Sequence, residues 1–255
     1  MNRARDAVSV TADANASIGP DIEGIIDDGS LRVAYQPIHS IHRDQIVGFE
    51  ALARFDREPL RPPSDWFREA ELEGCRIDLE LHAITRALEG IGALPGGAFL
   101  SLNASPSTIV SPRLSSTLAG APLERIVLEV TEQEPIDSYD QFAEAMRPLR
   151  EAGVRLAIDD VGAGYAGLMH IARLHPEILK LDRAVTSHVG TSRSMRALTA
   201  AIAGFATEIS CAVLAEGIET EQELRLMTAL GASLGQGYLL GRPAPAVTIT
   251  VTQES

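Results

Sequence analysis

Short apolar runs alternate with longer amphipathic segments over most of the chain. Eight runs have the length and apolar content of buried strands, and they lie at 33–38, 46–52, 98–103, 125–130, 154–159, 178–181, 211–215 and 232–239. Between most of them, apolar residues recur at the spacing of one helix face, notably at 64–74, 77–90, 137–152, 194–209 and 221–230. Strands that alternate with helices in this way predict an α/β domain with a mostly parallel sheet.

The ends of several predicted helices carry capping residues. Ser64 and Thr220 are candidate N-caps, whereas Gly153 and Gly231 follow predicted helix ends. A short helix is also predicted at 21–29, ahead of the first strand. The first two strands are joined too briefly for a crossover helix, so we expect an antiparallel hairpin there. The pattern therefore predicts a modified TIM (β/α)8 barrel with an antiparallel first strand.

Length and composition favour one barrel domain. A chain of 255 residues with 45% hydrophobic residues can form a single α/β barrel, which we place at 21–250. Residues 1–20 are polar and aperiodic, so we expect a disordered N-terminal tail or linker there. That segment lacks the apolar core of a signal peptide, and no apolar run reaches membrane-spanning length. We therefore expect a cytoplasmic protein without membrane insertion.

Charge and cysteine content limit the classes of partner. The net charge of −13 argues against duplex nucleic acid or an anionic membrane surface, since both require a basic surface. A small anionic ligand is still compatible, because exposed charges more than about 8 Å apart are largely screened at physiological salt. Cys75 and Cys211 have no metal-ligand spacing, and Cys211 is expected to be a small buried residue.

Polar residues occur at or near the ends of seven predicted strands. In a barrel these ends meet at the C-terminal mouth, where TIM-barrel enzymes keep their active sites. The adjacent acids Asp159 and Asp160 repel each other there, and a divalent cation would offset that cost. Successive strand residues face opposite ways, so one acid could bridge two metals while the other holds one. The residues at the mouth are Glu50, Asn103, Glu129, Asp159, Asp160, Lys180, Glu216 and Gln236.

Each of these residues has a simpler interpretation when it is taken alone. Turn chemistry, helix termini and ion pairs all place polar residues at strand ends. The alternatives are a turn for Asn103 and Gln236, a helix N-terminal carboxylate for Glu216, an ion pair for Glu129, an ion pair with Asp182 for Lys180, and a solvated loop pair for Asp159 and Asp160.

The donor atoms favour hard cations. Carboxylate and amide oxygens without His or Cys select Mg²⁺ or Mn²⁺ over Zn²⁺ or copper. Five carboxylates and one amide are enough for two ions about 3.5–4 Å apart, the arrangement used for in-line phosphoryl displacement. Arg54 shares a strand face with Glu50 and could bind a phosphate, or it could be a surface residue beside Asp56. Lys180 could position the attacking water. The predicted reaction is phosphodiester or phosphomonoester hydrolysis.

The sequence around these positions resembles the EAL-domain cyclic di-GMP phosphodiesterases. The similarity spans about residues 31–245, with the motifs in the family's order and with similar spacing. The motifs are Tyr35-Gln36-Pro37-Ile38, Glu50-Ala51-Leu52 followed by Arg54, Asn103-Ala104-Ser105, Leu128-Glu129-Val130-Thr131-Glu132, Asp159-Asp160, Lys180-Leu181-Asp182, Ala215-Glu216-Gly217-Ile218-Glu219-Thr220 and Gly235-Gln236-Gly237-Tyr238.

The resemblance implies a modified barrel that hydrolyses cyclic di-GMP to linear 5′-pGpG with two Mg²⁺ or Mn²⁺ ions, which lowers cellular cyclic di-GMP. A metal-bound water would attack the phosphorus in line, and the chain would form a homodimer. The implied roles are metal binding by Glu50, Asn103, Glu129, Asp159, Asp160 and Glu216, with Asp159 bridging; catalysis or its support by Lys180, Glu50, Gln236 and Glu219; substrate contact by Gln36, Arg54, Leu52 and Asp182; and loop support by Glu132.

One loop departs from the family pattern. The family's Asp-Asp-Phe-Gly-Thr-Gly has Val161 and Ala163 here in place of the aromatic and hydroxyl residues. This change removes loop packing and a possible hydrogen bond to Glu132, and it bears on metal affinity and dimerisation. The complete ligand set favours an active phosphodiesterase. The alternatives are a catalytically silent cyclic di-GMP receptor that signals through a partner, and an unrelated metal-dependent barrel acting on a phosphorylated metabolite.

Overall fold

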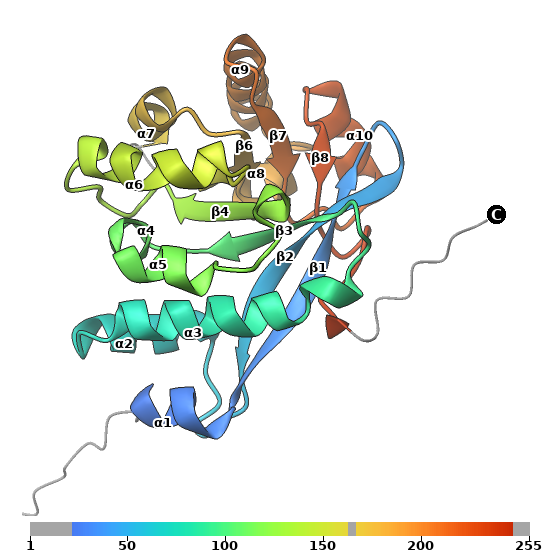
Figure 1. Ribbon diagram of the computed structural model, residues 1–255. Coiled ribbons are helices and arrows are strands. Elements are labelled where there is room, and N and C mark those ends of the chain that lie inside the picture. The colour runs from blue at the N-terminus through green and yellow to red at the C-terminus, as the bar shows by residue number, and fades with distance from the viewer. Residues whose placement is uncertain (1–21, 163–166, 247–255) are drawn as a thin grey trace, which may run out of the picture.

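The computed structural model describes residues 22–162 and 167–246 (Figure 1). The predicted tail at 1–20, the last four residues of the predicted barrel domain and Ala163 of the departing loop lie outside these ranges. Within the described residues, eight strands close into one barrel in sequence order, as predicted. The strands are β1 Leu31–Ser40, β2 Gln45–Phe55, β3 Phe99–Asn103, β4 Ile126–Thr131, β5 Arg155–Val161, β6 Ile178–Leu181, β7 Ala212–Ala215 and β8 Leu234–Gly235.

The first strand runs against its neighbours. β1 pairs antiparallel with both β2 and β8, whereas every other neighbouring pair is parallel. The four residues that separate β1 from β2 leave no room for a crossover helix, which is why this pair forms a hairpin. The modified barrel with an antiparallel first strand is therefore confirmed.

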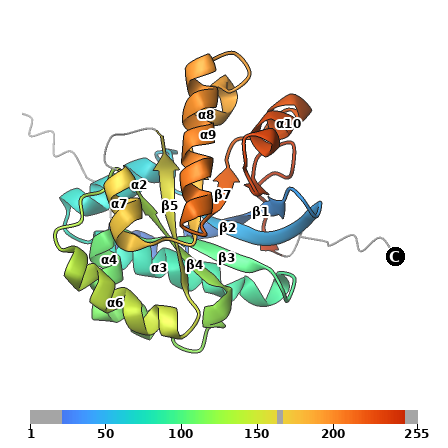
Figure 2. The same cartoon turned by 90° about the horizontal axis from the view of Figure 1, so that it is seen from above.

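Helices cover the outside of the barrel. Figures 1 and 2 show α3, α4 and α6 on one side of the strands and α9 and α10 on the other. The helices are α1 Ile22–Asp28, α2 Pro63–Leu72, α3 Arg76–Glu89, α4 Pro106–Val110, α5 Pro112–Thr117, α6 Tyr139–Glu151, α7 Gly167–Leu174, α8 Arg183–His188, α9 Arg193–Glu208 and α10 Glu221–Ala229, with short 3-10 helices at Ile91–Ala93 and Leu123–Arg125.

Most predicted caps hold. Thr220 caps α10 in a capping box with Glu223, while Gly153 and Gly231 follow α6 and α10 with φ of 100° and 105°. The prediction for Ser64 is wrong. The helix α2 begins at Pro63, because the fixed φ of proline suits the first helical position, so Ser64 lies inside the helix.

The last strand is shorter than predicted. Of the run 232–239, only Leu234–Gly235 is strand. Gly237 then passes so close to the next segment that an added Cβ would lie 2.1 Å from the carbonyl oxygen of Ile218. The chain turns there, with Leu240 donating its backbone N–H to the carbonyl of Gly237. A turn at this point leaves Gln236 directly beyond the strand, at the barrel mouth.

The core has an inner layer and an outer layer. The outer and larger cluster packs helices against strands, and it contains Val161 and Cys211, both buried, the latter as predicted. A smaller cluster supports the far end of the β1–β2 hairpin under α1, α2 and α3, around Trp66. The inner cluster takes one apolar residue from each of six strands: Ile38, Phe99, Val127, Ala157, Ile178 and Leu214.

Candidate functional site

Polar side chains form the next layer of the barrel interior, toward the mouth. Side chains two residues apart along a strand share a face, so the residues two positions beyond the inner apolar cluster also point inward. On β3 to β6 these are Ser101, Glu129, Asp159 and Lys180, and the equivalent residue of β7 is Glu216, directly after the strand. On the antiparallel β1 the equivalent position lies two residues earlier, at Gln36, which pairs across the hairpin with Glu50 of β2. The topology thus gathers polar groups from different strands into one layer.

Lys180 lies at the centre of this layer. Its side chain is only 1% exposed, and it is the single lysine of the sequence. The four ion pairs of its ammonium run to Glu129 at 2.8 Å, Glu216 at 2.8 Å, Asp159 at 3.0 Å and Glu50 at 3.4 Å. These carboxylates come from four other strands or their ends, so the predicted alternative of a pair with Asp182 does not describe Lys180. Asp182 instead accepts a hydrogen bond from the backbone N–H of Ala184 and caps α8.

Glu50 is held by side chains from β3 and from the segment directly after β8. Gln236 donates to its Oε2 at 2.6 Å and also donates to the side-chain oxygen of Gln36 at 3.1 Å. Asn103 donates to Oε1 of Glu50 at 3.4 Å. Gln36 in turn donates to the backbone carbonyl of Gly241. Gln236 and Asn103 therefore hold Glu50 directly, and Gln36 holds Gln236, so neither Asn103 nor Gln236 is merely a turn residue.

Glu129 is the most completely enclosed acid of the group. Its side chain is 1% exposed. Ser101 donates a short hydrogen bond to Oε1, and the Lys180 ammonium donates to Oε2. Both carboxylate oxygens of Glu129 are therefore held, one by a residue of β3 and the other by a residue of β6.

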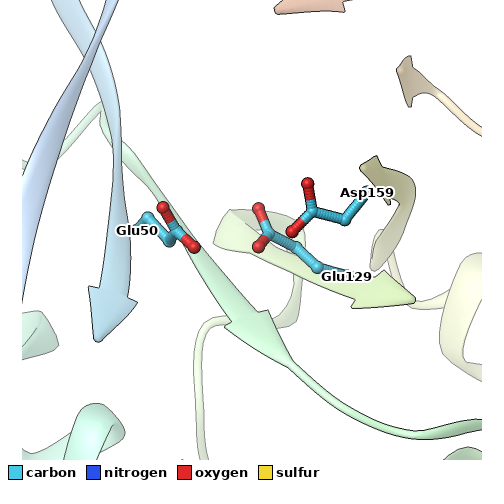
Figure 3. A group of neighbouring side chains, drawn as sticks. All are labelled: Glu50, Glu129 and Asp159. Carbon is cyan, nitrogen blue, oxygen red and sulfur yellow. The ribbon is translucent and has the colours of Figure 1, made fainter. Parts of the chain in front are cut away.

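Two groups of carboxylates could each hold a metal ion. Glu50, Glu129 and Asp159 form one group, and Asp159, Asp160 and Glu216 form the other, with the ligand oxygens of each group within 4.8 Å of one another. Figure 3 shows the first group, three acids from three strands whose carboxylates point toward a common space. Asp159 belongs to both groups. The donor set is all oxygen, and a cationic ammonium already lies among these oxygens, so the residues fit hard divalent cations.

Asp160 reaches the site by an irregular backbone. Strand alternation predicts that Asp159 and Asp160 face opposite ways, but Asp160 has φ of 58° and the β5–β6 register shifts between Ile158 and Val161. The left-handed conformation brings the Asp160 carboxylate back beside that of Asp159. Thr131 of β4 donates to Asp160 at 3.3 Å. The prediction that the two acids face opposite ways is therefore wrong at Asp160. The two still differ in place, because Asp159 belongs to both carboxylate groups and Asp160 to one.

Burial and charge shift the pKa values of the cluster in different directions. Burial raises the pKa of Glu129 well above its ordinary value, because the attraction of Lys180 only partly offsets desolvation and neighbouring acids add to it. Burial likewise raises the pKa of Glu216 to about 8. Burial also acts to raise the pKa of Glu50, but Lys180 and the hydrogen bond from Gln236 outweigh it and the pKa falls. For Lys180 desolvation would lower the pKa, yet the surrounding acids raise it well above its ordinary value.

Two cavities open on either side of the cluster. The larger, about 550 Å³, is lined by Arg54, Asn103 and Glu129 together with the inner face of α3. It lies where β2 and β3 diverge, since their pairing ends at Glu50 and Ser101. The smaller, about 300 Å³, is lined by Gln36, Glu50, Leu52, Asp159, Arg183, Glu216, Gly217, Glu219, Gln236, Gly237 and Tyr238. Leu52 lines both cavities.

Other predicted residues lie at the rim or behind the layer. Arg54 is exposed at the larger cavity and donates to the carbonyl of Ala53, whereas the acid Asp56 pairs with Arg32. Glu219 lies at the rim of the smaller cavity. Glu132 is buried directly after β4, and its backbone N–H donates to the carbonyl of Asp159, so the start of the β4 loop is tied to β5. The loop after β5, which the Glu132 side chain is predicted to support, lies partly outside the described residues.

Three residues that contact the site were not predicted. Ser101 holds Glu129, Thr131 holds Asp160, and Arg183 lines the smaller cavity. For Ser101 a signal existed, because it is a polar residue two positions before Asn103 in an otherwise apolar strand. For Arg183 the only signal was its place directly after the Lys180-Leu181-Asp182 motif.

The fold and the site define an α/β barrel with an oxygen-only candidate metal centre at its C-terminal mouth. The EAL domain family matches residues 21–243. The chain belongs to the EAL domain family.

Several relatives are known by activity or by structure. Over 94% of the chain it is 29% identical to the cyclic di-GMP phosphodiesterase NbdA of Pseudomonas aeruginosa, covering 32% of that protein. Over 92% it is 27% identical to the probable cyclic di-GMP phosphodiesterase PdeG of Escherichia coli, covering 49%. The manganese and cyclic di-GMP complex of Klebsiella pneumoniae BlrP1 shares 32% identity and a TM-score of 0.75, over 84% of this chain and 56% of that one. The chain thus spans roughly a third to a half of these curated relatives.

None of the helices within 22–162 and 167–246 combines the length and apolar character needed to cross a membrane.

Proposed function

We propose that this chain hydrolyses cyclic di-GMP to linear 5′-pGpG with two Mg²⁺ or Mn²⁺ ions and thereby lowers cellular cyclic di-GMP. The observation that carries the proposal is the position of Asp159 in both carboxylate groups. One carboxylate shared between two adjacent sites is the arrangement that brings two ions close enough to act on one phosphate. The names of relatives that act on or bind cyclic di-GMP support the choice of substrate.

The residues of the site would have separate roles in this reaction. Bound ions would neutralise charge on the phosphodiester and activate a water for in-line attack. Lys180, held among the acids, is within reach to donate a hydrogen bond to a nucleophile in the layer. Gln236 orients Glu50, and Glu132 ties the β4 loop to β5. The ligands would be Glu50, Asn103, Glu129, Asp159, Asp160 and Glu216.

The two cavities suit a ligand with two bases on either side of a central ring. Leu52 separates them and would contact both halves of the molecule. Arg54 at the larger cavity can offer a guanidinium fork to a phosphate or a base edge. Gln36 lines the smaller cavity, where Glu219 lies at the rim. Asp182 is not among the described residues that line either cavity, so its contribution to substrate binding would act through the N-terminus of α8.

The location and assembly of the chain are part of the same proposal. The substrate is an intracellular nucleotide, so we place the chain in the cytoplasm. The proposal includes a homodimer, and Met169 of α7, 55% exposed, and Leu198 of α9, 37% exposed, are candidate apolar contacts for its interface. Leu198 lies beside Gly162, where β5 ends. Sedimentation of the purified chain with and without metal would test this assembly.

Incubation of purified protein with cyclic di-GMP and Mg²⁺ or Mn²⁺, followed by chromatography of the nucleotides, tests the function. We expect conversion to pGpG that requires the metal and stops with a chelator. Binding of cyclic di-GMP without turnover would instead indicate a receptor. A protein that neither binds nor cleaves it would direct attention to another phosphorylated substrate.

A further inference from the structure

Arg183 lies at the wall of the smaller cavity and has no role in the proposed chemistry so far. It is the first residue of α8 and follows the Lys180-Leu181-Asp182 motif directly. The cavity that it lines also contains the candidate metal ligands Glu50, Asp159 and Glu216. Its guanidinium pairs with Glu219 at 2.7 Å, and the two side chains are 63% and 43% exposed. The pair therefore joins the β6 and β7 sides of the mouth at its solvent edge.

The backbone at Gly217 gives Arg183 its path into this position. Gly217 has φ of 65°, and an added Cβ would lie 2.4 Å from Cγ of Arg183. The aliphatic part of Arg183 thus crosses directly over the backbone next to Glu216. A side chain at 217 would displace the arginine as well as strain the turn. The local sequence therefore keeps a guanidinium beside the carboxylate cluster.

The charge of the cavity makes this arginine significant. Among the described residues that line the smaller cavity, Arg183 is the one cation, and Glu50, Asp159, Glu216 and Glu219 line the same cavity. Lys180 does not line it but pairs with the first three of these acids. A phosphodiester that enters this space meets acids on most sides. The Arg183 guanidinium lies at the solvent edge of the cavity, paired with Glu219, and a guanidinium can bind phosphate oxygens through two parallel hydrogen bonds.

We propose that Arg183 binds a non-bridging oxygen of the substrate phosphodiester, and that Glu219 holds the arginine at the mouth when no substrate is bound. This inference rests on the proposed function, because it takes cyclic di-GMP as the ligand. On binding, the guanidinium exchanges the Glu219 carboxylate for the phosphate. Arg183 is then a substrate-binding residue, and Glu219 sets how readily it is released.

Binding measurements on Arg183→Ala and Arg183→Lys test the first part. Titration of cyclic di-GMP in Ca²⁺, the ion in another BlrP1 complex with this nucleotide, gives Kd, and chromatography afterwards checks that the ligand is intact. We expect Kd to rise about tenfold for Arg183→Ala, the loss of one charge-assisted contact. Lysine keeps the charge without the fork, so Arg183→Lys should weaken binding by only about threefold.

Arg225→Ala is the matched control. Arg225 is 72% exposed and pairs with Glu221 at 4.0 Å on α10, outside the residues that line the cavity. It removes the same unit of charge from the protein. We expect its Kd to stay within about twofold of the wild type. Circular dichroism and melting temperature of each variant establish that all are folded.

The double variant Arg183→Ala with Glu219→Gln tests the second part. Removing the Glu219 charge alone should tighten binding about threefold, partly by releasing Arg183 and partly by reducing repulsion of the phosphate. In the Arg183→Ala background only the second effect is left, so the gain should shrink toward unity. A gain of equal size in both backgrounds would overturn the role of Glu219.

The outcomes separate this inference from the proposed function. If wild-type protein binds and cleaves cyclic di-GMP while Arg183→Ala matches Arg225→Ala in Kd, the inference is wrong and the function stands. If the wild type does not bind cyclic di-GMP, both fall together. A selective rise in Kd for Arg183→Ala, smaller in Arg183→Lys, supports the inference.

Discussion

The ammonium of Lys180 lies 2.8 Å from Oε2 of Glu129, and each of these side chains is only 1% exposed. Three further acids pair with the same ammonium. In the absence of a divalent ion, the lysine charge compensates carboxylates that would otherwise repel one another in a buried layer. The four carboxylates that pair with Lys180 all belong to the two candidate metal groups. We therefore expect Lys180 to stabilise the metal-free protein and to oppose the binding of a metal ion by the same carboxylates.

Lys180→Met should consequently change two quantities in opposite directions. The substitution should lower the free energy of unfolding of the metal-free protein by about 3–5 kcal/mol, because it leaves the buried acids without their counter-ion. The same variant should gain more stabilisation from Mn²⁺ than the wild type does, because the metal no longer competes with an ammonium. Urea unfolding in a chelator and in Mn²⁺ measures both changes. Equal stabilisation by Mn²⁺ in the two proteins would show that Lys180 does not compete with metal.

The single lysine also gives a direct probe of its own charge. With ¹⁵N-labelled lysine the protein should show one side-chain Nζ resonance, since the sequence contains no other lysine. The acids around Lys180 raise its pKa well above the ordinary 10.5, despite the opposing effect of desolvation. In metal-free protein this resonance should therefore show no deprotonation as the pH passes 10.5. A midpoint at or below 10.5 would contradict the ion pairs.

The sign of the corresponding stability effect follows from the raised pKa. The folded state holds its lysine proton more tightly than the unfolded state. The contribution of Lys180 is thus fully present below the unfolded pKa, and it is lost as the pH rises from there through the folded pKa. Unfolding of metal-free protein at pH values rising from 10.5 should show this loss, with no contribution from Lys180 to the pH dependence below that value, and the loss should be absent in Lys180→Met.

Glu50→Gln tests the metal centre with little change in shape. Glu50 belongs to one of the two carboxylate groups and accepts hydrogen bonds from Gln236 and Asn103. An amide keeps the size but removes the negative charge, so we expect at least a hundredfold loss of kcat at saturating substrate. Product formation at several Mn²⁺ concentrations measures it. Full activity in Glu50→Gln or Glu50→Ala would remove the metal hypothesis.

Ser101→Ala tests whether Glu129 needs a partner on its second oxygen. The hydroxyl of Ser101 donates to Oε1 of Glu129 within the buried layer. Loss of a group that orients a metal ligand costs about 10–100-fold in metal affinity or activity. We expect weaker Mn²⁺ binding by calorimetry in this range, with a smaller change in substrate Kd. Ser107→Ala is the control, because the hydroxyl of Ser107 contacts that of Ser105 and no carboxylate of the cluster.

The periodicity of the sequence predicted the barrel because buried strands and helix faces repeat over several residues. The same period predicted that Glu129, Asp159 and Lys180 meet at one mouth. It failed at Asp160, since a register shift and a positive φ depend on neighbouring strands rather than on local sequence. The short helices α4 and α8 were missed because five or six residues do not complete a repeat. Ion pairs across the barrel, such as those of Lys180, require the closed fold.

The network around Arg76 connects α3 to the loops after β3 and β4. Arg76 donates to Glu80 at 2.7 Å and pairs with Glu134 beyond β4. Glu80 in turn accepts from the backbone and hydroxyl of Ser105, the N-cap of α4. The Arg76 side chain is 25% exposed and Glu80 is 6% exposed, so these contacts are far less screened than surface pairs. The network thereby fixes the wall of the larger cavity next to Asn103.

Arg76→Met should therefore destabilise the protein more than an ordinary surface ion pair would. Removing the guanidinium leaves the buried Glu80 and the partly buried Glu134 without their shared cation, at a cost of about 2–3 kcal/mol in the free energy of unfolding. Arg147→Met is the matched control, because Arg147 pairs with Glu151 at 3.8 Å and both side chains are about 70% exposed; its cost should stay below about 0.5 kcal/mol. Urea unfolding of both variants gives the comparison. Equal costs would mean that α3 is held against the barrel by its apolar face alone, and the loops after β3 and β4 would then need another explanation for their position.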